Sequence, residues 1–173
     1  MSRPSQLVDS SWPSISYSRG TFGHTEVLSA IYGPYESRNS SKSNMTKSIV
    51  EVVISDLNTQ TDHSSSERIL SDLFSSVIKT QKYPYLTIMF CLQLFTKDQN
   101  FLSACINSAF QALKASNIET NFNLIAADYE VSGGGMATLA VIPNTDEILL
   151  SLCEKPMDFE VYKRLVHSLA GVS

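Results

Sequence analysis

One candidate for a binding or reaction site is the short polar segment Lys97–Asn100, which lies between an apolar run and a helical repeat. Leu86–Phe95 is almost unbroken apolar sequence, which is typical of a strand covered on both faces and is too short to span a membrane. A loop that leads into a helix N-terminus is a ready anion site, because unpaired backbone N–H groups point outward there. An enzyme that uses phosphate would add arginines, but this helix opens with Phe101 and Leu102. The sequence therefore predicts the setting of a phosphate site without the side chains that hold phosphate.

Three further polar features are candidates for function. Asp128 and Glu130 alternate along one segment, so both carboxylates could lie on one edge and hold a divalent ion against a phosphate. Together with Lys97 they would be the reacting groups if the chain were an enzyme. His63 lies in a Ser-rich loop and is a candidate general base, but this context favours a solvated loop histidine. The glycine triplet 133–135 is not followed by Lys-Ser or Lys-Thr, which indicates a turn and not a phosphate-binding loop.

Two predicted helices position these groups. Ser64 and Glu67 fit a capping box at the start of the first helix, Asn100 is the expected N-cap of the second, and Asn117 is its expected terminator. Apolar residues repeat at helical spacing in both: Ile69, Leu70, Leu73, Phe74, Val77 and Ile78 in the first, and Leu102, Cys105, Ile106, Ala109, Phe110 and Leu113 in the second.

The remaining pattern predicts strands and one more helix. Asp158 should cap the last helix, with Phe159, Tyr162, Leu165, Val166 and Leu169 on its apolar face and His167 solvated. Residues 1–19 are rich in Ser and Pro and are expected to form a flexible arm, followed by one domain over 20–173. The element order predicts an α/β fold, a two-layer mixed β-sheet with packed helices. The expected strands are Thr25–Tyr32, Lys47–Ile54, Leu86–Phe95, Phe122–Ala127, Met136–Ile142 and Glu147–Cys153.

Composition sets limits on function. The 173 residues are enough for one domain with a real core, and 43% hydrophobic with 17% charged residues is ordinary for a globular protein. A net charge of −4 argues against a free-standing nucleic-acid binder, which usually carries a basic face. The three cysteines are expected to be reduced core residues without zinc-binding spacing. The sequence shows no signal peptide, transmembrane run or lipidation motif, so we expect no membrane partner. We also expect no cofactor.

Several motifs in the correct order resemble the RNase PH family of phosphorolytic exoribonucleases and exosome core subunits. The segment 20–28 and the turn Tyr32-Gly33-Pro34-Tyr35-Glu36 resemble the family's first hairpin, and residues 140–145 resemble a segment of its non-catalytic exosome subunits. Within the family the chain is most similar to the exosome component five type. The resemblance implies the RNase PH fold from about Gly20 onward. The family's pattern around the second helix is matched by Asp98, Ala104, Ile106, Asn107 and Ala109.

The same resemblance implies that the reaction site is vestigial. The family arginine that grips phosphate falls on Leu102, and a second phosphate-binding arginine falls on Asp72, so Asp72, Asp98 and Leu102 mark the former phosphate site. The two metal-binding aspartates fall on Ala126 and Ser132, or their segment is deleted and residues 128–135 form a hairpin. Arg68 matches a family arginine, and it and Lys97 are the residues expected to contact RNA.

The implied function is therefore a catalytically inactive ring subunit of the RNA exosome, which assists assembly and RNA threading in 3′-to-5′ RNA degradation and rRNA processing. Its expected partners are other RNase PH-like subunits, cap subunits and single-stranded RNA, in the nucleus, nucleolus and cytoplasm. An isolated copy is expected to form a homodimer when these partners are absent. The alternative is an active phosphorolytic or metal-dependent exoribonuclease that works as a homodimer.

Overall fold

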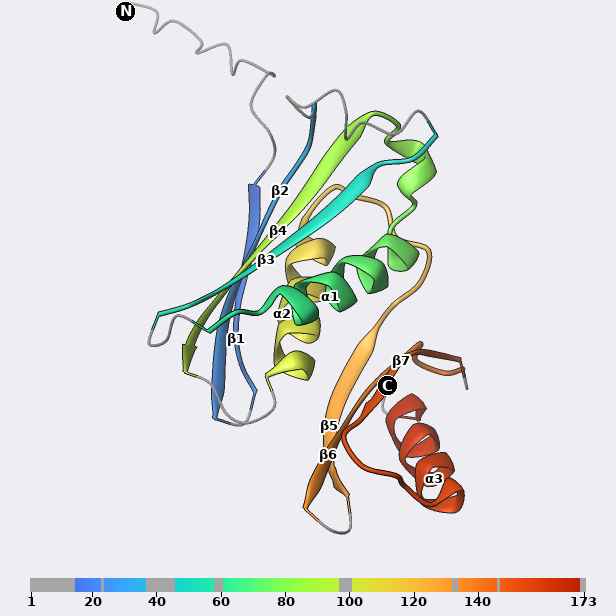
Figure 1. The fold of residues 1–173 in the computed structure, drawn as a ribbon. Helices are drawn as coiled ribbons and strands as arrows, with labels where there is room; N and C mark the ends of the chain where they lie inside the picture. The colour runs from blue at the N-terminus through green and yellow to red at the C-terminus, as the bar shows by residue number, and fades with distance from the viewer. Residues whose placement is uncertain are drawn as a thin grey trace, which may run out of the picture.

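The computed structural model describes residues 15–22, as main chain only, and residues 24–36, 46–57, 61–96, 101–131, 134–145 and 147–171. Within these ranges the chain forms two sheets and three α-helices (Figure 1). In chain order the elements are β1 (Ile15–Phe22), β2 (Thr25–Glu36), β3 (Ile49–Asp56), α1 (Ser64–Val77), a 3-10 turn (Thr80–Lys82), β4 (Leu86–Thr96), α2 (Leu102–Ala115), β5 (Ile125–Val131), β6 (Gly135–Val141), β7 (Ile148–Cys153) and α3 (Phe159–Ala170).

The first sheet is mixed and has the strand order β1-β2-β4-β3. β3 and β4 run parallel because α1 crosses between them, whereas the other pairs are antiparallel. Along the central strand β4, Phe90, Leu92 and Leu94 are fully buried and the alternate residues Cys91 and Gln93 are half-buried. The predicted covering of this strand on both faces is therefore wrong within this chain, because both helices lie on the same face.

Helices α1 and α2 lie side by side over one face of the first sheet, and the second sheet follows on the far side of α2 (Figure 1). This second sheet is antiparallel, with the order β5-β6-β7, and α3 covers part of its outer face. The α/β class and the mixed sheet are confirmed. The strands divide between two sheets, and α2 is packed between them.

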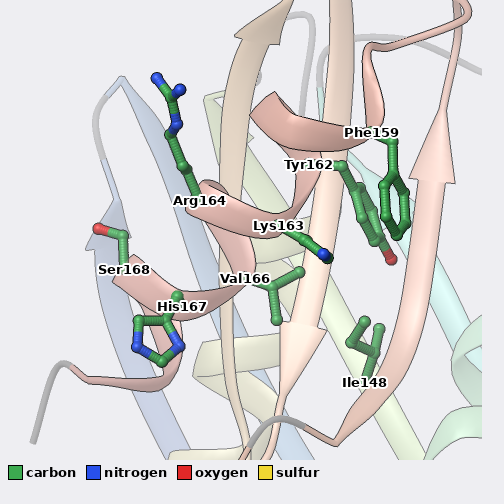
Figure 2. A pocket seen from close by; sticks show the side chains of 8 residues that line it. All are labelled: Ile148, Phe159, Tyr162, Lys163, Arg164, Val166, His167 and Ser168. Carbon is green, nitrogen blue, oxygen red and sulfur yellow. The ribbon is translucent and has the colours of Figure 1, made fainter.

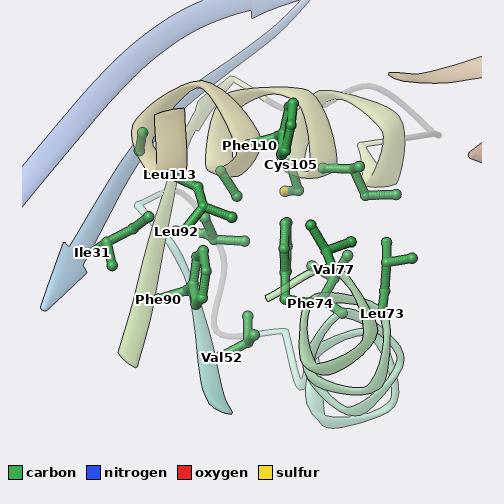
Figure 3. Close-up of a cluster of buried hydrophobic side chains, with 14 of the residues drawn as sticks. Ile31, Val52, Leu73, Phe74, Val77, Phe90, Leu92, Cys105, Phe110 and Leu113 are labelled. Carbon is green, nitrogen blue, oxygen red and sulfur yellow. The ribbon is translucent and has the colours of Figure 1, made fainter. Parts of the chain in front are cut away.

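The main core lies between α1, α2 and the first sheet. Phe74 of α1 stacks on Phe90 of β4, with ring centroids 4.6 Å apart and planes 16° from parallel. Figure 3 shows Cys105, Phe110 and Leu113 of α2 meeting this cluster from above. A much smaller cluster under α3 contains Leu139, Val141, Val166, Leu169 and Ala170. Most of the buried apolar residues thus belong to the cluster around α1, α2 and the first sheet.

Several predicted boundaries differ from the structure. β1 begins at Ile15, so the expected boundary at Gly20 falls inside a strand. β2 continues through Gly33 and Pro34 to Glu36, where we expected it to end at Tyr32. Gly33 has φ 123°, and a Cβ there would lie 2.7 Å from the Thr87 carbonyl oxygen, so the strand can pass this point only with glycine.

Helix and strand ends at the start of the second sheet also shift. α2 ends at Ala115 with Ser116 in extended conformation as the C-cap, so Asn117 is not the left-handed terminator we expected. The next strand begins at Ile125, three residues after the predicted Phe122, and continues to Val131. β5 and β6 form a hairpin, which is the second of the two alternatives given for residues 128–135, and β6 pairs antiparallel with β7. None of the described helices is long and apolar enough to span a membrane.

Candidate functional site at the start of helix α2

The first turn of α2 is held by apolar contacts. Leu102 is half-buried and packs against the main core, and Phe101 stands at the N-cap position without a side-chain cap. The expected cap, Asn100, and the predicted site residues Lys97 and Asp98 lie outside the described residues. Leu102, at the position where the resemblance places a phosphate-binding arginine, is therefore part of the hydrophobic packing.

A carboxylate of the chain itself reaches this helix start. Asp128 on β5 accepts a hydrogen bond from the Ser103 hydroxyl through Oδ2, and another from Thr138 Oγ1 to Oδ1 at 2.7 Å. Ser103 is the second residue of α2, so the negative charge lies where the helix dipole favours an anion. Asp128 is thus held by two hydroxyl groups in the setting that the sequence indicates for phosphate.

The carboxylate also affects its apolar neighbour Cys105. Burial, and after it the charge of Asp128, raises the pKa of the Cys105 thiol to about 12. The thiol therefore stays protonated at physiological pH and serves as a small core side chain.

Asn107, which matches the family pattern, has a structural role. Its Nδ2 donates to the Ala126 carbonyl at 2.8 Å, and its Oδ1 accepts from the Ala126 amide at 3.0 Å. β5 is an edge strand of the second sheet, so Asn107 satisfies backbone groups that no strand on that side pairs. This contact fixes β5 on α2 two residues before Asp128.

The start of α1 lies beside the start of α2 through a ring contact. His63, at the N-cap position of α1, packs edge-on against Phe101 with ring centroids 5.2 Å apart. Only 8% of His63 is exposed, and its Nε2 has no hydrogen-bond partner in the described structure. The prediction of a solvated loop histidine is wrong, because the turn before α1 folds His63 against Phe101.

The predicted capping box is also wrong. α1 has no side-chain cap, and the Glu67 carboxylate accepts instead from the Ile54 amide at 2.8 Å. Glu67 therefore ties the helix to the end of β3 and does not bond back to its own N-terminus.

Arg68 and Asp72 project from the exposed side of α1. They are four residues apart and so lie on one face of the helix, but neither side chain forms a hydrogen bond or ion pair with another described residue. Asp72 puts negative charge where the resemblance places an arginine. Of the predicted site residues, Arg68 and Asp72 are thus exposed on α1, whereas Leu102 on α2 is half-buried.

The structure describes the candidate metal ligands only in part. Glu130 is exposed two residues beyond Asp128, Ala126 is buried, and Ser132 lies outside the described residues. Among the described residues, no group of three or more His, Cys, Asp or Glu side chains is placed to hold a metal ion. Ser103 and Thr138, the partners of Asp128, were not predicted from the sequence, because only the fold brings them together.

Comparisons with known proteins agree with this architecture. The profile of the RNase PH family, described as "3' exoribonuclease family, domain 1", matches residues 16–119. An exosome complex component RRP41 of Caenorhabditis elegans is 30% identical over 153 residues, which cover 74% of this chain and 64% of that protein. The chain thus spans somewhat less than two thirds of this relative's length.

Solved structures share the fold. Rice (Oryza sativa) Rrp46 matches with a TM-score of 0.74 and 20% identity over 90% of this chain and 87% of the other. A chain of the Archaeoglobus fulgidus exosome with RNA bound to the active site matches with a TM-score of 0.66 and 9% identity, over 91% and 84% of the two chains. With a family match that covers more than half of its residues and the same fold in these structures, the chain belongs to the RNase PH family of 3′ exoribonucleases.

Proposed function

We propose that this chain is a catalytically inactive RNase PH-type subunit of an RNA exosome ring, with a structural role in assembly and in RNA threading. The observation that carries the proposal is the start of α2, where Leu102 packs into the core and the Asp128 carboxylate bonds to Ser103. Both features oppose the binding of an attacking phosphate.

The reaction of this family joins two anions, inorganic phosphate and the terminal phosphodiester of RNA. Its rate depends on cations that stabilise the developing charge, and removal of one such group costs about 10²–10³ in kcat. Here one expected arginine is Leu102, another is Asp72, and a further carboxylate, Asp128, lies beside the helix start. A phosphate there would meet like charge, which is unfavourable in a partly buried site.

The partners in this proposal come from similar proteins. The relatives include exosome complex components, and the matching structures include exosome cores. We therefore place the chain among other RNase PH-like ring subunits and cap subunits, along a path of single-stranded RNA. The corresponding processes are 3′-to-5′ RNA degradation and rRNA processing in the nucleus, nucleolus and cytoplasm.

Affinity purification of the tagged chain from its own cells, followed by mass spectrometry, tests this placement. We expect the other RNase PH-like subunits and the cap subunits to co-purify in similar amounts and to remain bound in high salt. The tag alone serves as the control. A purified chain without any other ring subunit would contradict the proposed assembly.

A further inference from the structure

An open groove lies between α3 and β7. Two adjoining hollows of about 760 and 500 Å³ share Phe159 and Tyr162 as common walls. Ile148 borders the first hollow and Cys153 the second, so the groove follows β7 along its length. We call it the α3–β7 groove.

The groove exists because one helix is too narrow for this sheet. A helix with side chains is about 10 Å wide and neighbouring strands are about 4.8 Å apart, so one helix covers roughly two strands. The cluster under α3 contains residues of β5 and β6 but none of β7. In the sheet register Ile148 pairs with Val141 and Cys153 with Ala137, so these β7 residues face the α3 side but lie beside the helix and not beneath it.

The walls of the groove present apolar side chains to solvent. Phe159 is 63% exposed and Ile148 39% exposed. Figure 2 shows Tyr162, Lys163 and Val166 directed from α3 toward the side of the groove that carries Ile148. Phe159, Tyr162 and Val166 follow one another at intervals of three and four residues, which is the spacing of a helix–helix contact.

The charged side chains near the groove indicate which sign of charge a binding partner should carry. After Glu160 in the first turn, the helix carries Lys163, Arg164 and His167 but no carboxylate. The two hollows are lined by Lys155, Lys163 and Arg164 against one carboxylate, Glu154, so the groove is locally basic on a chain whose net charge is −4. Acidic side chains of a partner would therefore meet complementary charge along α3.

From this groove and its charge, we propose that the α3–β7 groove docks an acidic amphipathic helix of another protein. The apolar face of that helix covers Ile148 and Phe159, and its carboxylates lie beside Lys163, which points toward the Ile148 side (Figure 2). It thereby completes the helical layer over β7, in the mode of a helix bound in an apolar groove. This inference goes beyond the ring role proposed above and does not depend on it.

A protein helix fits this groove better than single-stranded nucleic acid. Nucleic acid binds by stacking its bases on exposed aromatic faces. Here the Lys163 ammonium covers Phe159 at 4.8 Å from the ring centroid, and Tyr162 is half-buried. Ile148 and Val166 are aliphatic and offer no stacking surface, which leaves His167 as the remaining aromatic ring in the lining of the first hollow.

The test uses the full chain and a fluorescent synthetic peptide of about 18 residues, with leucines at helical spacing on one face and glutamates on the other. Fluorescence anisotropy measures its binding, and thiol labelling reports whether Cys153 becomes protected. The controls are the same peptide with lysines in place of glutamates, and a single-stranded RNA oligonucleotide.

We expect the acidic peptide to bind and protect Cys153, and the basic peptide to bind at least about tenfold more weakly. Phe159→Ser and, separately, Lys163→Glu should each lower affinity by roughly tenfold. Val53→Ser, at a site 44% exposed on the first sheet, should change nothing. Since Phe159 and Lys163 are exposed, both variants should fold, which circular dichroism checks.

Three results would overturn the proposal. Equal binding of the two peptides would show that charge does not select the partner. Tighter binding of the RNA at this groove, lost in Phe159→Ser, would make it a nucleic-acid surface. Self-association that is abolished by Phe159→Ser in sedimentation equilibrium would make a second copy of this chain the occupant.

Discussion

The start of α2 and the α3–β7 groove differ in how far the chain itself fills them. At the start of α2, Leu102 packs into the core and two hydroxyl groups hold Asp128. In the groove, Phe159 and Ile148 remain exposed, because α3 packs on β5 and β6 and not on β7. The first region has the setting of a reaction site and is filled by the chain's own side chains, whereas the second is open to a partner.

In the proposals above, the first region is a former reaction site and the second is a surface for binding a partner. Apolar and hydrogen-bonded groups at the start of α2 stabilise the fold, since they unite α1, α2 and β5. The exposed residues along α3 contribute little to that core. Substitutions in the two regions should therefore have separable effects on stability and on binding.

The largest expected difference is in thiol reactivity. Cys105, near the start of α2, is buried with a pKa of about 12, whereas Cys153 in the groove is exposed. Because the thiolate is the reactive form, Cys105 should react at least about 10³-fold more slowly than an unperturbed, exposed cysteine thiol does at pH 8. Labelling with a chromogenic disulfide should show one fast thiol in the native chain and three after denaturation. Fast labelling of Cys105 in the native chain would contradict the description of this helix start.

The second prediction concerns the link between α2 and β5. Asn107→Ala leaves the Ala126 amide and carbonyl without their side-chain partner and should lower the free energy of unfolding by about 1–3 kcal/mol. Chemical denaturation measures this loss. Asn123→Ala, at an exposed position, is the matched control and should change stability by less than about 0.5 kcal/mol. Equal effects of the two substitutions would mean that Asn107 does not hold the edge strand.

A third prediction is that phosphate binding can be restored at the start of α2. The double variant Leu102→Arg with Asp128→Asn replaces a leucine by a cation and removes the internal negative charge. Saturating phosphate should then stabilise it by about 1–3 kcal/mol relative to chloride at equal ionic strength, whereas the unchanged chain should show no shift. Thermal unfolding measures both, and Leu102→Arg alone should respond less. A large phosphate shift in the unchanged chain would argue that its own groups already form the site.

The smallest expected effect concerns RNA. Arg68 is exposed on α1, and Arg68→Ala should weaken binding of single-stranded RNA a few-fold and reduce the salt slope by about one. Arg164→Ala, on α3, removes the same charge from the other region and should leave RNA binding unchanged. Filter binding at several salt concentrations separates the two. If Arg164→Ala weakened RNA binding and Arg68→Ala did not, the RNA-binding surface would lie on α3 and not on α1.

Much of the fold could be predicted from the sequence, because periodicity reports burial directly. The apolar repeats around Phe74 and Phe110 predicted α1 and α2. The strand predicted over Lys47–Ile54 is β3, whose buried face consists of Val50, Val52 and Ile54. The same reasoning failed for Phe159, which follows the apolar repeat of α3 but is exposed. The repeat identifies a face of the helix, but it does not tell how many strands lie beneath that face.

The candidate site was predicted only in part, because its contacts join residues that are distant in the sequence. Leu102 could be identified from its place at the start of a helix. The bond between Ser103 and Asp128 joins residues 25 apart, and the burial of His63 depends on Phe101. Glu67 fitted a local cap but bonds to Ile54 instead, since the end of a neighbouring strand offered an amide within reach.

We propose that this chain does not perform phosphorolysis. The release of nucleoside diphosphates from single-stranded RNA tests this proposal most directly. The purified chain is incubated with RNA, with and without phosphate and magnesium, beside an active family member as positive control. We predict no diphosphate release above the protein-free blank under any of these conditions. Phosphate-dependent release in proportion to the amount of this chain would contradict the account.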